Sequence, residues 1–154
     1  MIEELLDQCD VETGGLGRDL LLSWDEVMEM SGKGIAFGSH SVSHPCLTNI
    51  SLEQAKDEIV QSKKVIEEKL GKRVSSFSYP FGAYNLEIGR LVKESGLKCG
   101  VLAYPSKLVG PNVNVYSLPR IKPVNDFNKL RGILAGLVED VYARMPEYVI
   151  SKIY

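Results

Sequence analysis

The clearest hydrophobic pattern in the chain lies at residues 51–70. Apolar and small side chains recur there at steps of three and four, while charged side chains occupy the opposite face. The members of the recurring face are Ala55, Ile59, Ser62, Ile66 and Leu70. Ser51 and Gln54 have the spacing of a capping box at its start, and Gly71 follows its end. The pattern predicts an amphipathic helix that packs on a sheet.

Three further segments carry helix signals. Ser23 and Glu26 form a second capping box, which predicts a short helix over 24–31 that stops at Gly32. Asn85 is a suitable N-cap for a helix that Gly96 closes. From 125 to about 144, apolar residues follow helical spacing until Pro146 interrupts it.

Short apolar runs between these helices predict strands. They lie at 33–38, 74–79, 99–103 and 115–118, and glycine or proline bounds most of them. Helices that alternate with short buried strands are typical of α/β units around a mostly parallel sheet. Residues 1–22 carry no strong signal beyond a glycine-rich loop at 13–17.

Composition adds limits to this α/β fold. The chain has 154 residues with a formal charge of −2, so we expect a single domain and no general nucleic-acid binding. No apolar run approaches the roughly 20 residues that span a bilayer, and the acidic N-terminus does not resemble a signal peptide. The chain as given is therefore expected to be cytoplasmic. Its three cysteines are widely spaced and predict no disulfide framework.

The only two histidines, His40 and His44, lie four residues apart directly after a predicted strand. This spacing lets two imidazoles converge on one divalent metal ion, for which neutral imidazole is a common ligand. For an isolated pair, the alternative is that the histidines cap backbone groups or lie on a surface turn. Position favours the metal, because open α/β sheets place ligands at the carboxyl ends of their strands.

Two other turns leave predicted strands at the same end. The turn formed by Tyr79, Pro80, Phe81 and Gly82 is a candidate substrate-binding segment, because a Pro and a Gly allow a sharp bend that presents backbone N–H groups. Arg120 follows the last strand and could orient a carboxylate. The alternatives are an ordinary strand-to-helix turn and a solvated surface charge.

Together these segments resemble the polysaccharide deacetylases, the NodB-homology carbohydrate esterases. The residues from His40 to His44 match the family's H-[ST]-x-x-H motif, and those from Phe77 to Gly82 are similar to its next motif. The segments from Leu22 to Glu26 and from Leu118 to Ile121 resemble flanking parts of the same family. The resemblance covers about residues 16–124.

The resemblance implies a distorted (β/α) barrel with a divalent metal, usually zinc, held by an Asp and both histidines. In this family the metal activates water for attack on the acetamide of an N-acetylated oligo- or polysaccharide, with an Asp as base and a late His as acid. The Phe81 backbone N–H would stabilise the oxyanion. Ser78 stands where the family has an Arg that steadies the base, and Arg120 is a candidate replacement.

Two parts of the family pattern are not found. Residues 1–22 contain no segment like the family's Asp-Asp motif, and no histidine follows His44. We therefore expect residues 1–154 to form one deacetylase-like domain that lacks its first one or two β/α units. It would be an incomplete, distorted barrel with weak metal binding and no activity by itself. A non-catalytic carbohydrate-binding module and a structural remnant are the alternatives.

An incomplete barrel would leave a sheet edge unpaired. We expect a homodimer, or a cover from residues 1–15 or from the apolar C-terminal segment. The apolar residues of that segment are Val149, Ile150, Ile153 and Tyr154.

Overall fold

The structure is a computed structural model that describes residues 21–103, 113–120 and 125–135. The chain divides into two compact units, residues 1–36 and 37–154, which are described separately. Within the described residues, no helix combines the length and apolar character needed to span a membrane.

In the first unit, helix α2 spans Trp24–Gly32, as predicted. The Ser23 side chain accepts a hydrogen bond from the Glu26 N–H, and the Glu26 carboxylate accepts one from the Ser23 N–H at 2.7 Å. Reciprocal capping of this kind satisfies two backbone donors that the first turn leaves unpaired.

The strand predicted at 33–38 is wrong. The N–H groups of Gly34 and Ile35 donate to the carbonyls of Ser31 and Met30, so they complete the end of α2 and are not available to a sheet. Ile35 is half exposed. Helix termination therefore prevails over the apolar character of the run, and only Ser39, beyond it, pairs with a strand.

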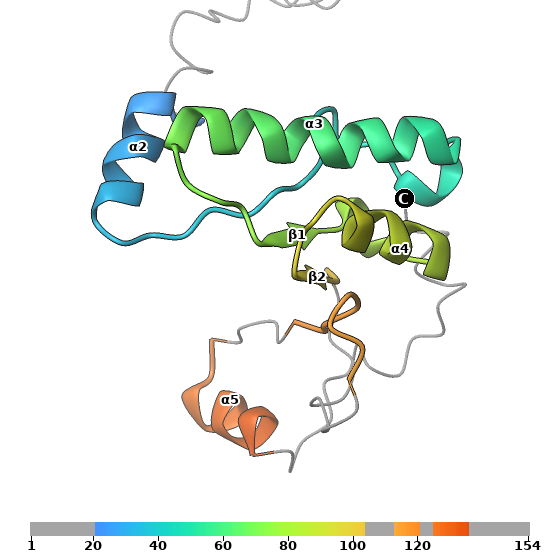
Figure 1. Ribbon diagram of the computed structural model, residues 1–154. Coiled ribbons are helices and arrows are strands. Elements are labelled where there is room, and N and C mark those ends of the chain that lie inside the picture. Colours follow the sequence, from blue (N-terminus) through green and yellow to red (C-terminus); the bar gives the residue numbers. More distant parts are fainter. Residues whose placement is uncertain (1–20, 104–112, 121–124, 136–154) are drawn as a thin grey trace, which may run out of the picture. The chain divides into compact units, whose positions relative to one another are not determined.

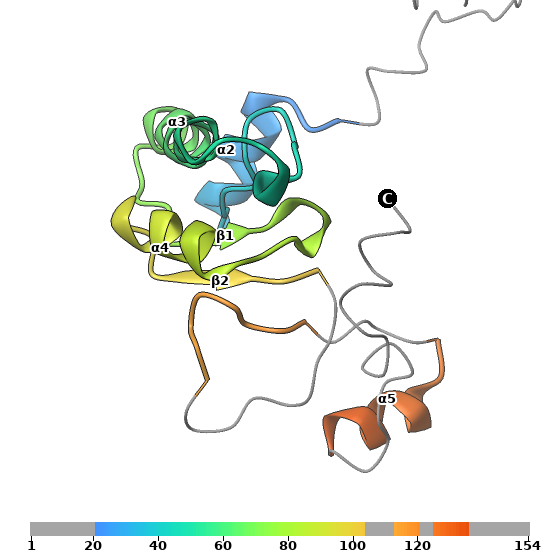
Figure 2. The ribbon, with the colours of Figure 1, turned by 90° about the vertical axis from the view of Figure 1, so that its right-hand side faces the viewer.

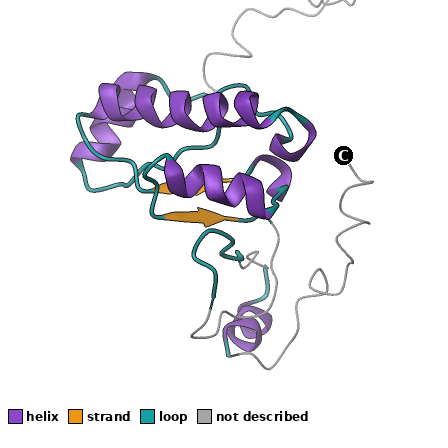
Figure 3. Cartoon of the chain, turned by 45° about the vertical axis from the view of Figure 1, so that its right-hand side comes forward, coloured by secondary structure: helices purple, strands orange, loops and turns teal. Residues whose placement is uncertain are grey.

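The second unit contains two short parallel strands, β1 (Ser76–Ser78) and β2 (Cys99–Val101), in the register Phe77 opposite Gly100. Figure 3 shows both strands in orange. The helices are α3 (Leu52–Leu70), α4 (Leu86–Glu94) and α5 (Phe127–Leu134), with 3₁₀ turns at Leu47–Asn49 and Pro80–Gly82.

Helix α3 confirms the amphipathic pattern. Its N-cap is Ser51, its capping box uses Gln54, and Gly71 ends it in the left-handed conformation at φ 62°. Ala55, Ile59 and Ser62 of the predicted face are buried. Helices α3 and α4 lie side by side against the strands (Figures 1 and 2) and enclose one apolar core. The core residues are Leu47, Ala55, Ile59, Val74, Phe77, Tyr79, Ile88, Val92 and Leu97.

The two strands are extended on either side by single residues. Ser39 pairs in parallel with Phe77, and Leu118 pairs in parallel with Val101. The predicted strand at 115–118 is thus reduced to one bridge, because Asn114 turns the chain by accepting from the N–H groups of Tyr116 and Ser117. The mostly parallel arrangement is confirmed, whereas no barrel is seen in the described residues.

The boundaries of the other predicted elements also differ. The strands expected over 74–79 and 99–103 are shorter, and Pro80 ends the first of them. The helix expected over 125–144 is described only as far as Leu134. Its later part, residues 1–15 and the C-terminal apolar segment lie outside the described residues.

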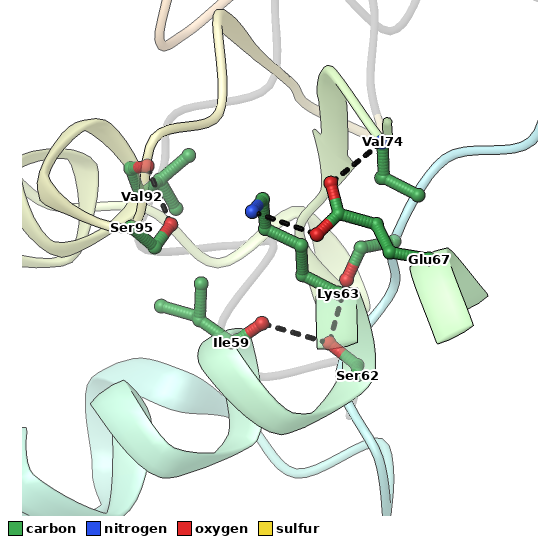
Figure 4. Close-up of polar contacts among 8 residues, drawn as sticks. Ile59, Ser62, Lys63, Glu67, Val74, Val92 and Ser95 are labelled. Carbon is green, nitrogen blue, oxygen red and sulfur yellow. Dashed lines mark hydrogen bonds and ion pairs between the residues drawn. The ribbon is translucent and has the colours of Figure 1, made fainter. Parts of the chain in front are cut away.

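A carboxylate joins the last turn of α3 to the segment that precedes β1. Glu67 accepts a hydrogen bond from the Val74 N–H at 2.9 Å and forms an ion pair with Lys63 at 3.1 Å (Figure 4). The Val74 N–H, followed by Lys63, lowers the pKa of Glu67. This contact fixes the direction in which the chain enters the sheet.

Candidate metal centre

His40 leaves the sheet at the carboxyl end of β1. Its neighbour Ser39 donates from its N–H to the Ser76 carbonyl and accepts from the Ser78 N–H, which aligns this residue with the strand. His40 Nδ1 lies 2.8 Å from the Ser78 carbonyl oxygen. Since a carbonyl oxygen only accepts, Nδ1 carries the proton, and the neutral ring keeps an electron pair on Nε2. Metal-ligating histidines commonly make this outer contact.

His44 lies against His40 and Phe81. The two imidazole rings have centroids 4.8 Å apart and meet edge to face at 75°, and the His44 and Phe81 rings are 4.7 Å apart. Two imidazoles that share a zinc ion at about 2.0–2.1 Å have ring centroids roughly 5 Å apart. The structure therefore brings together the two residues predicted as metal ligands, at a separation that suits a shared ion.

Helix α3 holds the loop between the histidines. The Glu58 carboxylate accepts hydrogen bonds from the N–H groups of Val42 (2.7 Å) and Ser43 (2.9 Å), and from the Ser43 hydroxyl (2.6 Å). Partial burial raises the pKa of Glu58, but the three hydrogen bonds outweigh it, so the pKa is lowered and the group is ionised at neutral pH.

Sequence reasoning missed Glu58. The signal that could have indicated it is its position on α3, because Glu58 borders the buried stripe three residues after Ala55 and one before Ile59. A charged residue beside a buried stripe indicates that its side chain has a polar partner in the segment that packs there.

Backbone strain is concentrated around the histidines. The non-glycine residues with positive φ in the described part of the chain are Ser41 (64°), His44 (59°) and Phe81 (58°). Each such residue costs on the order of 1–2 kcal/mol, and strain of this kind clusters at functional sites. The Ser41 hydroxyl accepts from the His44 N–H at 3.1 Å and so stabilises the bent loop.

The predicted substrate turn has a buried half and a more accessible half. Tyr79 and Pro80 are buried, whereas Phe81 and Gly82 are partly exposed. The Tyr79 hydroxyl donates to the Tyr116 carbonyl at 2.7 Å, and burial, with a smaller effect from Tyr84, raises its pKa. Tyr79 therefore supports the turn from the core, and a role in substrate contact stays a prediction for Phe81 and Gly82.

Close packing below the turn involves Gly100 of β2. A Cβ atom at this position would overlap the Tyr79 hydroxyl and would lie 2.8 Å from the Tyr116 carbonyl oxygen. The absence of a side chain at Gly100 is what allows Tyr79 to reach its partner across the strand.

Arg120 follows the bridge between Leu118 and Val101, at the carboxyl end of the same parallel arrangement. Its side chain is exposed, and within the described residues it forms no hydrogen bond or ion pair. Its role as an orienting group stays a prediction.

The histidine pair offers two imidazole donors that lie close together. In the described parts of the chain, no group of three or more His, Cys, Asp or Glu side chains is placed to hold an ion. Cys46 and Cys99 are free thiols. Two neutral imidazoles are suitable ligands for a divalent ion such as zinc. A four-coordinate zinc ion would need two further ligands.

An open depression of about 440 Å³ adjoins the loop. Its walls are formed by residues of the segment 42–50 and of α3: Val42, Ser43, Pro45, Ile50, Gln54, Asp57, Glu58 and Gln61.

Comparison with known proteins identifies the family. A family model described as "Polysaccharide deacetylase" matches residues 2–100, well over half of the chain. The chain belongs to the polysaccharide deacetylase family. The resemblance that the histidine motif and the following turn indicated is therefore confirmed.

Individual deacetylases show the same relationship. The chain is 27% identical over 107 residues to "Putative polysaccharide deacetylase YxkH" of Bacillus subtilis (strain 168), over 70% of this chain and 38% of the relative. It is 32% identical over 69 residues to "Peptidoglycan-N-acetylmuramic acid deacetylase PdaC" of the same organism, over 45% of this chain and 15% of the relative.

Among solved structures, the Streptococcus pyogenes deacetylase PplD in complex with acetate matches with a TM-score of 0.69 and 25% identity, over 76% of this chain and 53% of that chain. The chain thus spans about half or less of the length of these relatives. The α/β arrangement described above is that of a deacetylase over the part that it covers.

Proposed function

We propose that this polysaccharide deacetylase family member serves the metal-dependent removal of N-acetyl groups from an oligo- or polysaccharide, with His40 and His44 as ligands of a divalent ion, most suitably zinc. The hydrogen bond from His40 Nδ1 to the Ser78 carbonyl carries this proposal, because it leaves Nε2 unprotonated in a ring that lies 4.8 Å from the second imidazole. Membership of the family supports an acetylated glycan as the substrate class.

When bound, the ion would polarise the acetamide carbonyl and lower the pKa of a water molecule. The chain's own residues have more limited tasks in this proposal. His40 and His44 hold the ion without adding charge, and Phe81 restricts the His44 ring from one side. We assign the backbone N–H of Phe81 to the oxygen that becomes negative during attack, and Arg120 to the orientation of an acidic group.

Acidic groups are required as well. Two neutral imidazoles do not offset the charge of a dication, and an acid and a base each contribute typically about 10²–10⁴ to the rate. We propose that the acidic ligand and the base come from outside the described residues, from another part of the protein or from a neighbouring subunit. The described residues alone would then bind zinc weakly and would not hydrolyse substrate.

Zinc titration of the full chain by calorimetry tests the ligand assignment. We expect one ion per chain, and strongly weakened binding in both His40→Ala and His44→Ala. Cys46→Ser is the matched control, because its thiol is partly buried just after the loop and is the nearest other zinc donor in the sequence. Zinc binding that persists in both histidine variants but is lost in Cys46→Ser would overturn the assignment.

Acetate release from a pentamer of N-acetylglucosamine tests the reaction. The chain should be compared with a longer protein that includes any sequence encoded in frame upstream of Met1. Zinc-dependent release by the longer protein supports the proposal, and no release by it, although it binds zinc, contradicts deacetylation. Oligosaccharide binding that survives both histidine substitutions in metal-free buffer would instead indicate a non-catalytic carbohydrate-binding module.

A further inference from the structure

We propose that Glu58 is a positioning residue that sets the placement of His40 relative to His44 through the loop between them. The inference rests on the proposed function in assigning a purpose to this placement, but the placement itself can be tested without metal or substrate.

The contacts of Glu58 are directed at the centre of the loop. One carboxylate oxygen, Oε2, accepts from the consecutive N–H groups of Val42 and Ser43 at 2.7 and 2.9 Å, and Oε1 accepts from the Ser43 hydroxyl at 2.6 Å. Both oxygens are thus engaged with the loop. Glu58 acts through the loop and is not placed as a ligand itself.

The loop needs an external anchor because its own backbone is strained. Ser41 and His44 both have positive φ, which costs on the order of 1–2 kcal/mol for each residue. Apart from the 3.1 Å contact between Ser41 and His44, the described hydrogen bonds of residues 41–43 all go to Glu58. Charge-assisted hydrogen bonds are about twice as strong as neutral ones, so three of them can hold this conformation.

A second contact with α3 fixes the start of the loop. Ser62 donates to the Ile59 carbonyl, so the Ser39 hydroxyl, 2.6 Å away, donates to Ser62. Glu58 and Ser62 are four residues apart, which places them one above the other on the same face of the helix. Helix α3 therefore holds in place both the residue before His40 and the two residues before His44.

Proton NMR of the imidazole side chains tests this inference in metal-free protein. Because the chain has only two histidines, a His40→Asn variant assigns both sets of signals. In the wild type, the edge-to-face contacts with Phe81 and between the rings should shift the carbon-bound imidazole protons away from free-histidine values. Glu58→Gln should move them toward free-histidine values, because an amide cannot accept all three hydrogen bonds.

Asp57→Asn is the matched control, since it removes a neighbouring carboxylate that borders the same depression but does not bond to the loop. Its imidazole signals should stay as in the wild type. Ser43→Ala removes only the hydroxyl contact, so it should move the imidazole signals less than Glu58→Gln does. It also serves as the test variant if Glu58→Gln does not fold. Unchanged imidazole signals in Glu58→Gln, or in Ser43→Ala if that variant alone folds, would overturn the inference.

Zinc affinity then tests whether the placement of the two histidines matters for the proposed metal site. Glu58→Gln should weaken zinc binding about tenfold, which is the lower end of the loss caused by removing an outer-shell partner. Asp57→Asn should change it less than twofold. Imidazole signals that depend on Glu58 would uphold the positioning role even if this chain and the longer protein both bind no zinc, a result that would refute the proposed metal site.

Discussion

His40 Nδ1 and the carbonyl oxygen of Ser78 are 2.8 Å apart, and this contact leaves Nε2 as the nitrogen of the neutral His40 ring that carries a free electron pair. Ser78 takes part in this contact through its backbone carbonyl and not through its side chain. The bond joins the first residue of the histidine motif to the end of β1, and therefore couples the candidate metal site to the sheet.

Replacement of either histidine should reduce zinc affinity more than replacement of an outer-shell residue does. His40→Ala and His44→Ala each remove one of two imidazoles, so we expect a loss above the roughly 10–100-fold that loss of an outer-shell partner causes. Calorimetric titration at neutral pH measures it. Equal affinities for His40→Ala and Glu58→Gln would contradict a direct role of His40.

The two buried hydroxyls of Ser39 and Ser62 should show strong energetic coupling. Ser62→Ala leaves the buried Ser39 hydroxyl without its acceptor and should lower the free energy of unfolding by about 1–3 kcal/mol. The double variant Ser39→Ala with Ser62→Ala should lose less than the sum of the single variants. Denaturant unfolding of all four proteins gives the coupling, and additive losses would refute it.

Gly100 should not tolerate a side chain. Gly100→Ala places a methyl group against the Tyr79 hydroxyl and should cost about 1–3 kcal/mol through overpacking. In a Tyr79→Phe background the hydroxyl is gone, so the same substitution should cost less. Gly32→Ala is the control, because a Cβ there meets nothing within 4 Å. Thermal unfolding compares them, and an equal loss in both backgrounds would show that the Tyr79 hydroxyl does not contribute to the clash.

Acid should remove the stabilising effect of Glu67. Its pKa is lowered from the ordinary 4.5, first by the Val74 N–H and then by Lys63. The folded state thus favours the carboxylate, so the contribution is fully present above pH 4.5 and is lost as the pH falls through the lowered value. The free energy of unfolding should be about 1 kcal/mol higher for wild type than for Glu67→Gln at pH 7.

This difference should shrink progressively below pH 4.5, when the wild-type carboxyl is protonated. Urea unfolding at a series of pH values checks the prediction. Glu68→Gln provides the control, because the Glu68 carboxylate is exposed and makes only a 3.8 Å ion pair with Lys64. A difference between wild type and Glu67→Gln that is constant with pH would show that titration of Glu67 does not contribute.

Local signals in the sequence were sufficient for the helices. Ser51, Gln54 and Gly71 specify where α3 begins and ends through contacts within a few residues, and the structure confirms all three. The run at 33–38 failed because two backbone signals competed: the same residues are apolar enough for a strand, yet Gly34 allows the chain to close the end of α2.

The site was predictable only in part, because some of its contacts join residues that are distant in the sequence. The spacing of His40 and His44 is a local property, and the structure brings their rings together as expected. The contact of Glu58 with Val42 and Ser43 spans about 15 residues and depends on how α3 lies along the loop. Similarly, nothing around Tyr79 in the sequence shows that its hydroxyl reaches Tyr116 from within the core.

Three residues near the candidate site have left-handed backbone conformations: Ser41, His44 and Phe81. Substitutions that raise thermal stability at these positions would alter the site. Selection for heat resistance alone should favour glycine at Phe81, since glycine adopts this conformation without steric penalty. Such a variant would lose the ring beside His44 and gain conformational freedom in the turn. A screen that scores only folded yield would therefore select against the geometry that the proposed metal site requires.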